Sequence, residues 1–358
     1  MTVFLVGMVS FAVDTGYVAM TRTQMQRAAD AGALAGATSL ANWETRPIPE
    51  SDARSELQKY VQLNESLEIR DEDVRLFRFD PTASGDKRLT TTYSVAKPPN
   101  AIEVTLRRDK LANGQLSLFF APMLGQKASD VRVKAVGCIM PAKAVLPGVP
   151  MIPYTMHINY YYAALGYERN GMDGQKIETQ DEWSVSPNGT VTRGRDGINE
   201  VSLFGSDQQT PGNFGAIDLG SKSNGTPELE RQILYGPNYS DFHHKDFESK
   251  LQPDGSLLPP INIGGDPGIS AGVKNAYETI VGKPRIIPLF DSASGTGNNT
   301  VYHLVSFAAI VVTDSEFQGN PKRVWIQPTR IITNKVLSAD LDTELSEGIW
   351  TPPRLVIP

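Results

Sequence analysis

The chain has 358 residues, of which 40% are hydrophobic and 21% are charged, and its formal net charge is -6 at pH 7. This length allows two or three domains with a sizeable core, and the acidic balance argues against a nucleic-acid-binding surface. Cys138 is the only cysteine, so no intramolecular disulfide can form. It follows a strand-like run of residues, and we expect it to be buried.

Residues 1–41 are predicted to form one continuous helix, roughly 60 Å long at about 1.5 Å per residue. No proline occurs before Pro47, and good helix formers dominate residues 20–41. Residues 1–13 contain no ionisable side chain, and a helix that is apolar on every side lies in a membrane or in the centre of an assembly. Residues 1–20 only just reach the ~20 apolar residues that a membrane span needs.

Small residues mark one face of the second half of this helix. Ala28, Gly32 and Gly36 recur at a spacing of four, so they share one side of the helix and allow another backbone to approach closely. We expect them to support close helix packing, either within the chain or between subunits. The alternative is an Ala-rich helix that packs on its own domain. If the face serves assembly, Gly32→Leu or Gly36→Leu disrupts assembly more than folding.

The run FAVDTGYVAMTRTQMQRAADAGALAGA, residues 11–37, resembles the N-terminal signature of the TadE/TadG-like proteins of bacterial tight-adherence (Flp-type) pilus systems. The matching positions are Val13, Asp14, Gly16, Tyr17, residues 22–26 and residues 28–37. Weaker similarity continues to about residue 138. The resemblance implies a type IV pilin-like subunit, or a pilus-associated envelope protein, at the bacterial cell surface. It also implies insertion in the inner membrane before assembly, with further copies of the chain and other pilus components as partners.

Asp14 is a lone carboxylate inside the apolar half of the helix, where an unpaired charge is costly to bury. No basic residue lies three or four positions away along the helix, so a partner must come from elsewhere. By analogy with type IV pilins, in which a helix carboxylate neutralises a neighbouring subunit's N-terminal amine, we expect Asp14 to meet the Met1 amine or Arg22 of a neighbouring copy. The alternative is that Asp14 marks the end of the apolar layer and lies in water.

Residues 42–141 are predicted to form a small α+β unit. A short amphipathic helix begins near Ser51, and alternating apolar residues indicate half-buried antiparallel strands. These strands are expected at residues 73–80, 90–96, 101–108 and 129–140. Residues 118–125 are expected to form a short helix or loop with its apolar side inward. The layout matches a pilin-like head, and this comparison is an implication of the resemblance.

Residues 142–358 are predicted to form a β-rich surface domain that begins in a Pro-rich connector. Gly- and Asn-rich residues 169–200 indicate hairpins, and helices are expected at 226–236 and 270–282. Strongly apolar strands, the second of them central, are expected at 284–291, 301–314 and 323–332. The apolar tail, residues 347–358, is expected to pack on the body or on a neighbour. The predicted fold class is therefore α+β, with a long N-terminal apolar helix followed by two β-rich globular units.

No catalytic or metal-binding constellation is evident in the sequence. The four histidines are His157, His243, His244 and His303, and none has zinc-ligand spacing with the cysteine. HExxH, GxSxG and Walker motifs are missing. We therefore expect no enzyme activity and no cofactor, with a structural Ca²⁺ ion at clustered carboxylates as the remaining alternative. Those carboxylates are Asp173, Asp340, Asp342, Glu344 and Glu347.

Two classes of function remain. In the first, the chain is a structural subunit of a bacterial extracellular filament, with its N-terminal helices bundled in the core and its β-rich units exposed. In the second, it is a membrane-anchored minor pilin, adhesin or pilus-assembly protein of the cell envelope. An anchored enzyme is disfavoured, because no nucleophile lies beside a general base in any familiar pattern.

Overall fold

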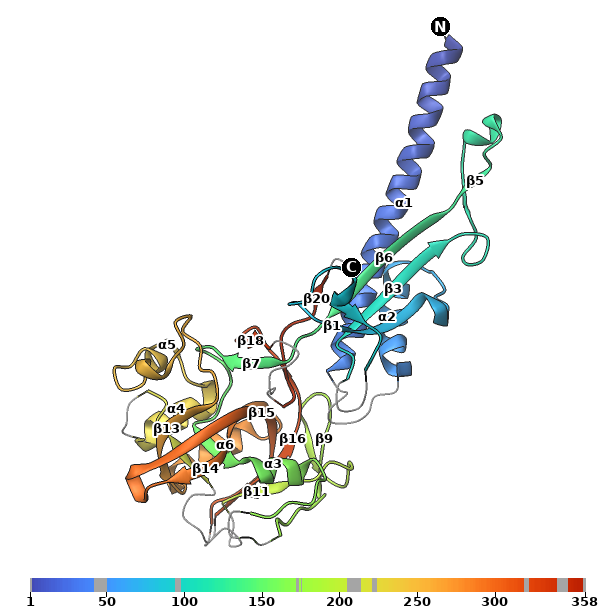
Figure 1. Cartoon of the computed structure of the whole chain (residues 1–358). Coiled ribbons are helices and arrows are strands. Elements are labelled where there is room, and N and C mark those ends of the chain that lie inside the picture. The colour runs from blue at the N-terminus through green and yellow to red at the C-terminus, as the bar shows by residue number, and fades with distance from the viewer. Residues whose placement is uncertain are drawn as a thin grey trace. The chain divides into compact units, whose positions relative to one another are not determined.

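A computed structural model describes residues 2–41, 50–93, 98–171, 174, 176–204, 214–220, 224–318, 322–339 and 347–356. The chain forms two compact units, which are coloured by residue number in Figure 1. Unit 1 contains residues 1–140 and 352–358, and unit 2 contains residues 141–351. The C-terminal tail, predicted as part of the second domain, folds with unit 1 over residues 352–356.

Unit 1 begins with a single helix, α1 (Thr2–Leu40), as predicted. Its Ala-rich second half packs on a sheet and on α2 (Glu50–Asn64), whose Leu57 and Val61 are fully buried. No helix among the described residues is both long enough and apolar enough to cross a membrane. The predicted long helix is present, but it is not apolar throughout, since four ionisable side chains lie on it. They are Asp14, Arg22, Arg27 and Asp30.

The sheet of unit 1 has five antiparallel strands in the order β2-β1-β3-β6-β20. They are β1 (Val74–Phe79), β2 (Leu89–Thr90), β3 (Ala101–Arg108), β6 (Val131–Cys138) and β20 (Arg354–Leu355). Strands β3 and β6 pair along their whole lengths, from Ala101↔Cys138 to Arg108↔Val131. Gly137 lets α1 lie close on this pair, because a Cβ there would be 2.2 Å from the carbonyl oxygen of Ala33.

Short segments join these strands. Two 3-10 helices, η1 (Asp71–Asp73) and η2 (Gly85–Arg88), flank β1. Of the strand predicted at residues 90–96, the structure shows only its start, in β2. Residues 94–97 lie outside the described residues.

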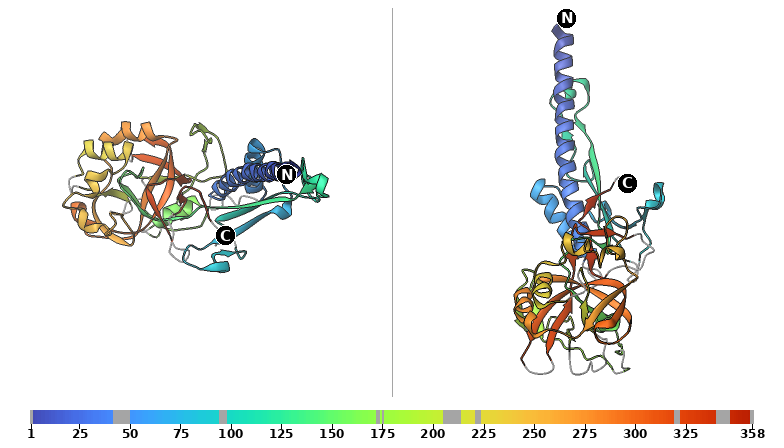
Figure 2. Two further views of the ribbon diagram at one scale, coloured as in Figure 1. Left: turned by 90° about the horizontal axis from the view of Figure 1, so that it is seen from above. Right: turned by 90° about the vertical axis from the view of Figure 1, so that its left-hand side faces the viewer.

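A long hairpin extends from the β3–β6 pair and lies beside the N-terminal half of α1 (Figures 1 and 2). Two short strands pair within it, β4 (Leu116–Ser117) and β5 (Ala128–Ser129). Between them lies one turn of 3-10 helix, η3 (Ala121–Leu124). The prediction that the apolar side of this segment points inward is wrong, since Phe119 and Met123 are exposed.

Unit 2 is built on seven strands in the order β11-β16-β15-β13-β12-β8-β14, and β14 also pairs with β15. They are β8 (Tyr154–His157), β11 (Val201–Leu203), β12 (Phe214–Ile217), β13 (Ile261–Pro267), β14 (Pro284–Ser294), β15 (Thr300–Glu316) and β16 (Arg323–Pro328). The additional pairing closes a ring of five strands, in which β8 and β14 run parallel. Strand β15 pairs with three neighbours, so the prediction of a central apolar strand is confirmed.

Short helices connect the strands of unit 2, and those within residues 158–164, 226–235 and 271–280 share its main apolar core. They are α3 (Ile158–Ala164), α4 (Thr226–Tyr235), α5 (Tyr239–Phe242), η4 (Glu248–Lys250), η5 (Ala271–Val273), α6 (Lys274–Ile280) and η6 (Gly297–Asn299). The two helices predicted in this domain are found as α4 and as η5 with α6. Ser270 caps η5, because its side chain accepts the backbone N–H of Gly272.

Three small strand pairs complete unit 2. They are β7 (Ala142–Val145) with β18 (Val336–Ser338), β9 (Trp183–Val185) with β10 (Val191–Arg193), and β17 (Ile331–Ile332) with β19 (Ile349–Trp350). The β9–β10 pair is one of the predicted hairpins. Helices and predominantly antiparallel sheets make up both units, so the α+β class is confirmed.

Candidate assembly surface

Asp14 joins α1 to the hairpin. Its carboxylate is only 6% exposed and accepts three backbone N–H groups, from Phe119 at 2.8 Å, Phe120 at 3.0 Å and Ala121 at 2.6 Å. These N–H groups lie at the start of η3, where a helical turn offers them no acceptor of its own. One side chain of α1 therefore satisfies the exposed donors of a turn about a hundred residues further along the chain.

The charge of Asp14 is stabilised where it lies. Burial acts to raise the pKa of Asp14, but the three N–H donors outweigh it, and the pKa is lowered. The carboxylate is thus ionised at neutral pH. The prediction that Asp14 lies in water is wrong, and its charge is already satisfied within its own chain. Pairing with Met1 or Arg22 of another copy is therefore not needed to offset its burial, and Arg22 is exposed.

Large apolar side chains are exposed on both segments that Asp14 joins. We define the apolar arm as residues 8–20 of α1 together with the tip, residues 118–124. Its exposed apolar side chains on α1 are Met8, Val9, Phe11, Val13 and Met20, and those on the tip are Phe119, Phe120 and Met123. The rings of Tyr17 and Phe119 lie 5.0 Å apart between centroids, so the two segments also touch through aromatic contact.

The small-residue face of α1 is covered within unit 1. A Cβ on Gly32 would lie 2.5 Å from the Val61 side chain, and one on Gly36 would lie 3.0 Å from Ile102. Ala28 is fully buried. Close packing occurs, and it is packing of α1 on its own unit, on both α2 and β3. The expectation that leucine at these glycines harms assembly more than folding must therefore be reversed, since the clash falls inside unit 1.

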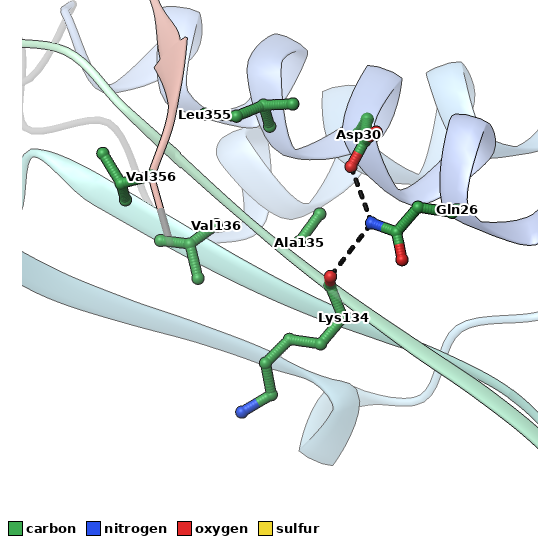
Figure 3. A pocket seen from close by; sticks show the side chains of 7 residues that line it. All are labelled: Gln26, Asp30, Lys134, Ala135, Val136, Leu355 and Val356. Atoms are coloured by element: carbon green, nitrogen blue, oxygen red, sulfur yellow. Dashed lines mark hydrogen bonds between the residues drawn. The ribbon is translucent and has the colours of Figure 1, made fainter. Parts of the chain in front are cut away.

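A small pocket lies between α1, β6 and β20 (Figure 3). Its volume is about 320 Å³, and its lining residues are Gln26, Asp30, Lys134, Ala135, Val136, Leu355 and Val356. Gln26 donates to the Asp30 carboxylate at 2.8 Å and to the Lys134 carbonyl at 3.1 Å. Gln26 belongs to the signature residues 22–26, and its position gives it a structural role: it ties α1 to the outer edge of β6.

The histidines do not form one site. His303 Nδ1 lies 2.8 Å from the Asp291 carboxylate, and His157 Nε2 lies 3.1 Å from the Asp291 carbonyl. Burial lowers the pKa of His157. His243 stacks on Tyr239, with 4.0 Å between ring centroids. None of these contacts places a nucleophile against a general base.

No group of three or more metal-ligating side chains that could hold an ion occurs in the part of the chain that the structure describes. Of the carboxylates proposed for Ca²⁺, Asp173, Asp340, Asp342 and Glu344 lie outside the described residues. Glu347 lies within them, and burial raises its pKa.

Unit 1 thus defines a class of protein in which a long helix lies on an antiparallel sheet and an apolar arm extends beyond it. Residues 1–39 match a family model described as "Putative Flp pilus-assembly TadE/G-like", and residues 35–136 match one described as "Putative Tad-like Flp pilus-assembly". No curated protein and no solved structure matched the chain. Residues 1–136 are therefore similar to Tad-like pilus-assembly families. This confirms the resemblance and supports a pilus-related role.

Proposed function

We propose that this chain is a structural subunit of a Tad-type pilus and that its copies associate through the N-terminal half of α1. The exposure of large apolar side chains there carries the proposal: Met8, Val9 and Phe11 are 57%, 63% and 71% exposed. Soluble monomers rarely leave a contiguous patch of this kind in water. In a filament, copies of α1 lie together in the core while unit 2 and the sheet of unit 1 remain at the cell surface. No catalytic step or cofactor is part of the proposal.

The proposed contact uses residues 8–20 rather than residues 28–36. The small-residue face is already filled by α2 and β3 of the same chain, so a neighbouring helix finds no free surface there. The large apolar residues that precede it remain available. Assembly and folding are thus assigned to different halves of one helix.

A pilus-assembly protein is the second candidate, and the family descriptions favour it because both name pilus assembly. Such a protein is required for pili to form but is not their repeating component. A minor pilin or adhesin differs again, because it is present in the filament at low copy number.

Purified pili distinguish these candidates. The proposal predicts that the chain is a repeating component, detectable by mass spectrometry and by immunogold labelling along the whole filament. It further predicts that Phe11→Glu abolishes pili, whereas Leu63→Glu does not, since Leu63 is 73% exposed on α2 outside the arm. Pili that contain none of this chain, yet disappear when it is deleted, would favour an assembly protein and reject the subunit.

A further inference from the structure

We infer that the tip of the hairpin forms part of the same self-association surface as α1, and that Asp14 is the residue that positions it. The inference rests on the proposed association of copies through α1. It assigns Asp14 a role that differs from pairing with a neighbour's charge. Its carboxylate acts inside one chain and holds the second half of an apolar surface in place.

The geometry of the tip supports a positioned element. Three N–H groups from consecutive residues 119–121 converge on one carboxylate, and hydrogen bonds to an ionised acceptor are stronger than those between neutral groups. Within the tip, backbone bonds join Met123 to Phe120 and Gly125 to Pro122. The small strands β4 and β5 contribute little more, with two residues each. Asp14 therefore supplies the main polar attachment of the tip to α1.

The side chains that this attachment orients are apolar and exposed. Phe11, Phe119 and Phe120 are 71%, 62% and 37% exposed, and at about 200 Å² for an aromatic side chain they alone leave roughly 300 Å² uncovered. Met8, Val9, Val13 and Met123 are each at least 43% exposed. Together these residues add to the apolar area that a partner could cover, although at about 100° per residue those of α1 point in several directions around the helix.

The occupant that fits this surface is a second copy of the same arm. Residues 2–13 and 118–124 contain no ionisable side chain. The carboxylate of Asp14, which joins the two segments, is satisfied by N–H groups of its own chain. A partner with charges at the contact would have to bury them without a counter-charge. Two copies of the arm meet without that cost, because each offers the other an uncharged apolar face.

Cysteine cross-linking of the full-length chain, in cells that produce it, tests the inference. Cys138 is fully buried, so the natural chain is an unreactive background for a short bis-maleimide. Three single variants are compared: Met8→Cys on α1, Met123→Cys on the tip, and Leu63→Cys on α2 as the control. We expect both arm variants to form cross-linked multimers of this chain, well above the control.

The positioning role is tested by adding Asp14→Ala to the first two variants. We expect the yield from Met123→Cys to fall by about tenfold or more, because three hydrogen bonds to a charged acceptor are lost together. The yield from Met8→Cys should fall much less, because Met8, Val9 and Phe11 remain exposed on α1 whether or not the tip is held in place. Asp30→Ala, which removes another carboxylate of α1, is the matched control and should leave both yields unchanged.

Each outcome has a distinct meaning. If Met8→Cys cross-links but Met123→Cys stays at the Leu63→Cys level, the inference is wrong while association through α1 stands. Cross-links from Met123→Cys to a different protein would also overturn it, as would a yield that Asp14→Ala leaves unchanged. If neither arm variant exceeds the control, the proposed function fails together with the inference.

Discussion

Gly137→Ala should unfold unit 1 locally, although it adds only one methyl group. The new Cβ would lie 2.2 Å from the carbonyl oxygen of Ala33 and 2.6 Å from its carbonyl carbon, whereas ordinary contacts begin at 3.4 Å. Both obstructing atoms belong to the backbone of α1, so no side-chain rotation relieves the clash. The helix and β6 must therefore move apart by about 1 Å along their packed face. Overpacking of this kind typically lowers the stability of the folded state by about 1–3 kcal/mol or more.

The assay is a urea titration of the full-length chain, combined with hydrogen exchange of β3 and β6 to report on unit 1 alone. We expect the free energy of unfolding of unit 1 to fall by about 3 kcal/mol, at the upper end of that range because the obstruction is backbone. Gly16→Ala is the matched control. Its Cβ meets nothing within 4 Å, so the helix should gain up to ~1 kcal/mol from the better propensity of alanine.

Equal protection of β3 and β6 in the natural chain and in Gly137→Ala would contradict this expectation. That result would mean that α1 does not lie on β6 at this distance. A loss of protection in both glycine variants would instead show that the added methyl group destabilises unit 1 without any clash at Ala33, because the effect of Gly→Ala on the unfolded chain is by itself stabilising.

Three further predictions follow from individual contacts. Gly32→Leu should lower the stability of unit 1 by about 1–3 kcal/mol through its clash with Val61, and a thermal melt that matches the natural chain would contradict this. Burial raises the pKa of Glu200 to about 7 against the hydrogen bonds from Glu182 and Trp183, so the folded state retains its proton longer than the unfolded one. Stability is therefore lost as pH rises from about 4.5 to about 7. The free energy of unfolding of Glu200→Gln, relative to that of the natural chain, should rise by up to about 3 kcal/mol between pH 5 and pH 8. Urea midpoints of both proteins at the two pH values test this, and a stability difference that is the same at both pH values would count against it. Arg285→Met should weaken α4 by about 1–3 kcal/mol, since the guanidinium donates to the carbonyls of Ile233 and Leu234 at its end; unchanged amide exchange in α4 would argue otherwise.

Local patterns in the sequence predicted much of the fold. The alanine-rich composition of residues 20–41 gave α1, and alternation gave β3 and β6, because these signals arise from neighbouring residues. Strand β20 was missed, since Arg354 and Leu355 pair with β6 across more than two hundred residues and two residues show no period. The closure of the ring by β8 and β14 is equally non-local.

The candidate site was predicted in part for the same reason. Asp14 stands out as a carboxylate in an apolar run, so its importance was visible. Its partners were not, because they are backbone N–H groups of residues 119–121, and every residue except proline has one. An uncapped apolar turn such as LFFAPML offers a weak hint that its first N–H groups need an acceptor.

The position of β20 has a consequence for synthesis. The outer edge of β6 at Gly137 and Cys138 is paired by residues that emerge from the ribosome only after all of unit 2. At about 5–20 residues per second, that edge waits roughly 10–40 s for its partner. During translation an open strand edge is a template for pairing with other chains. The nascent protein therefore passes through a period in which unit 2 can fold while the sheet of unit 1 is still incomplete. Incorrect pairing at this edge of β6 is therefore expected first between neighbouring nascent chains on the same polysome.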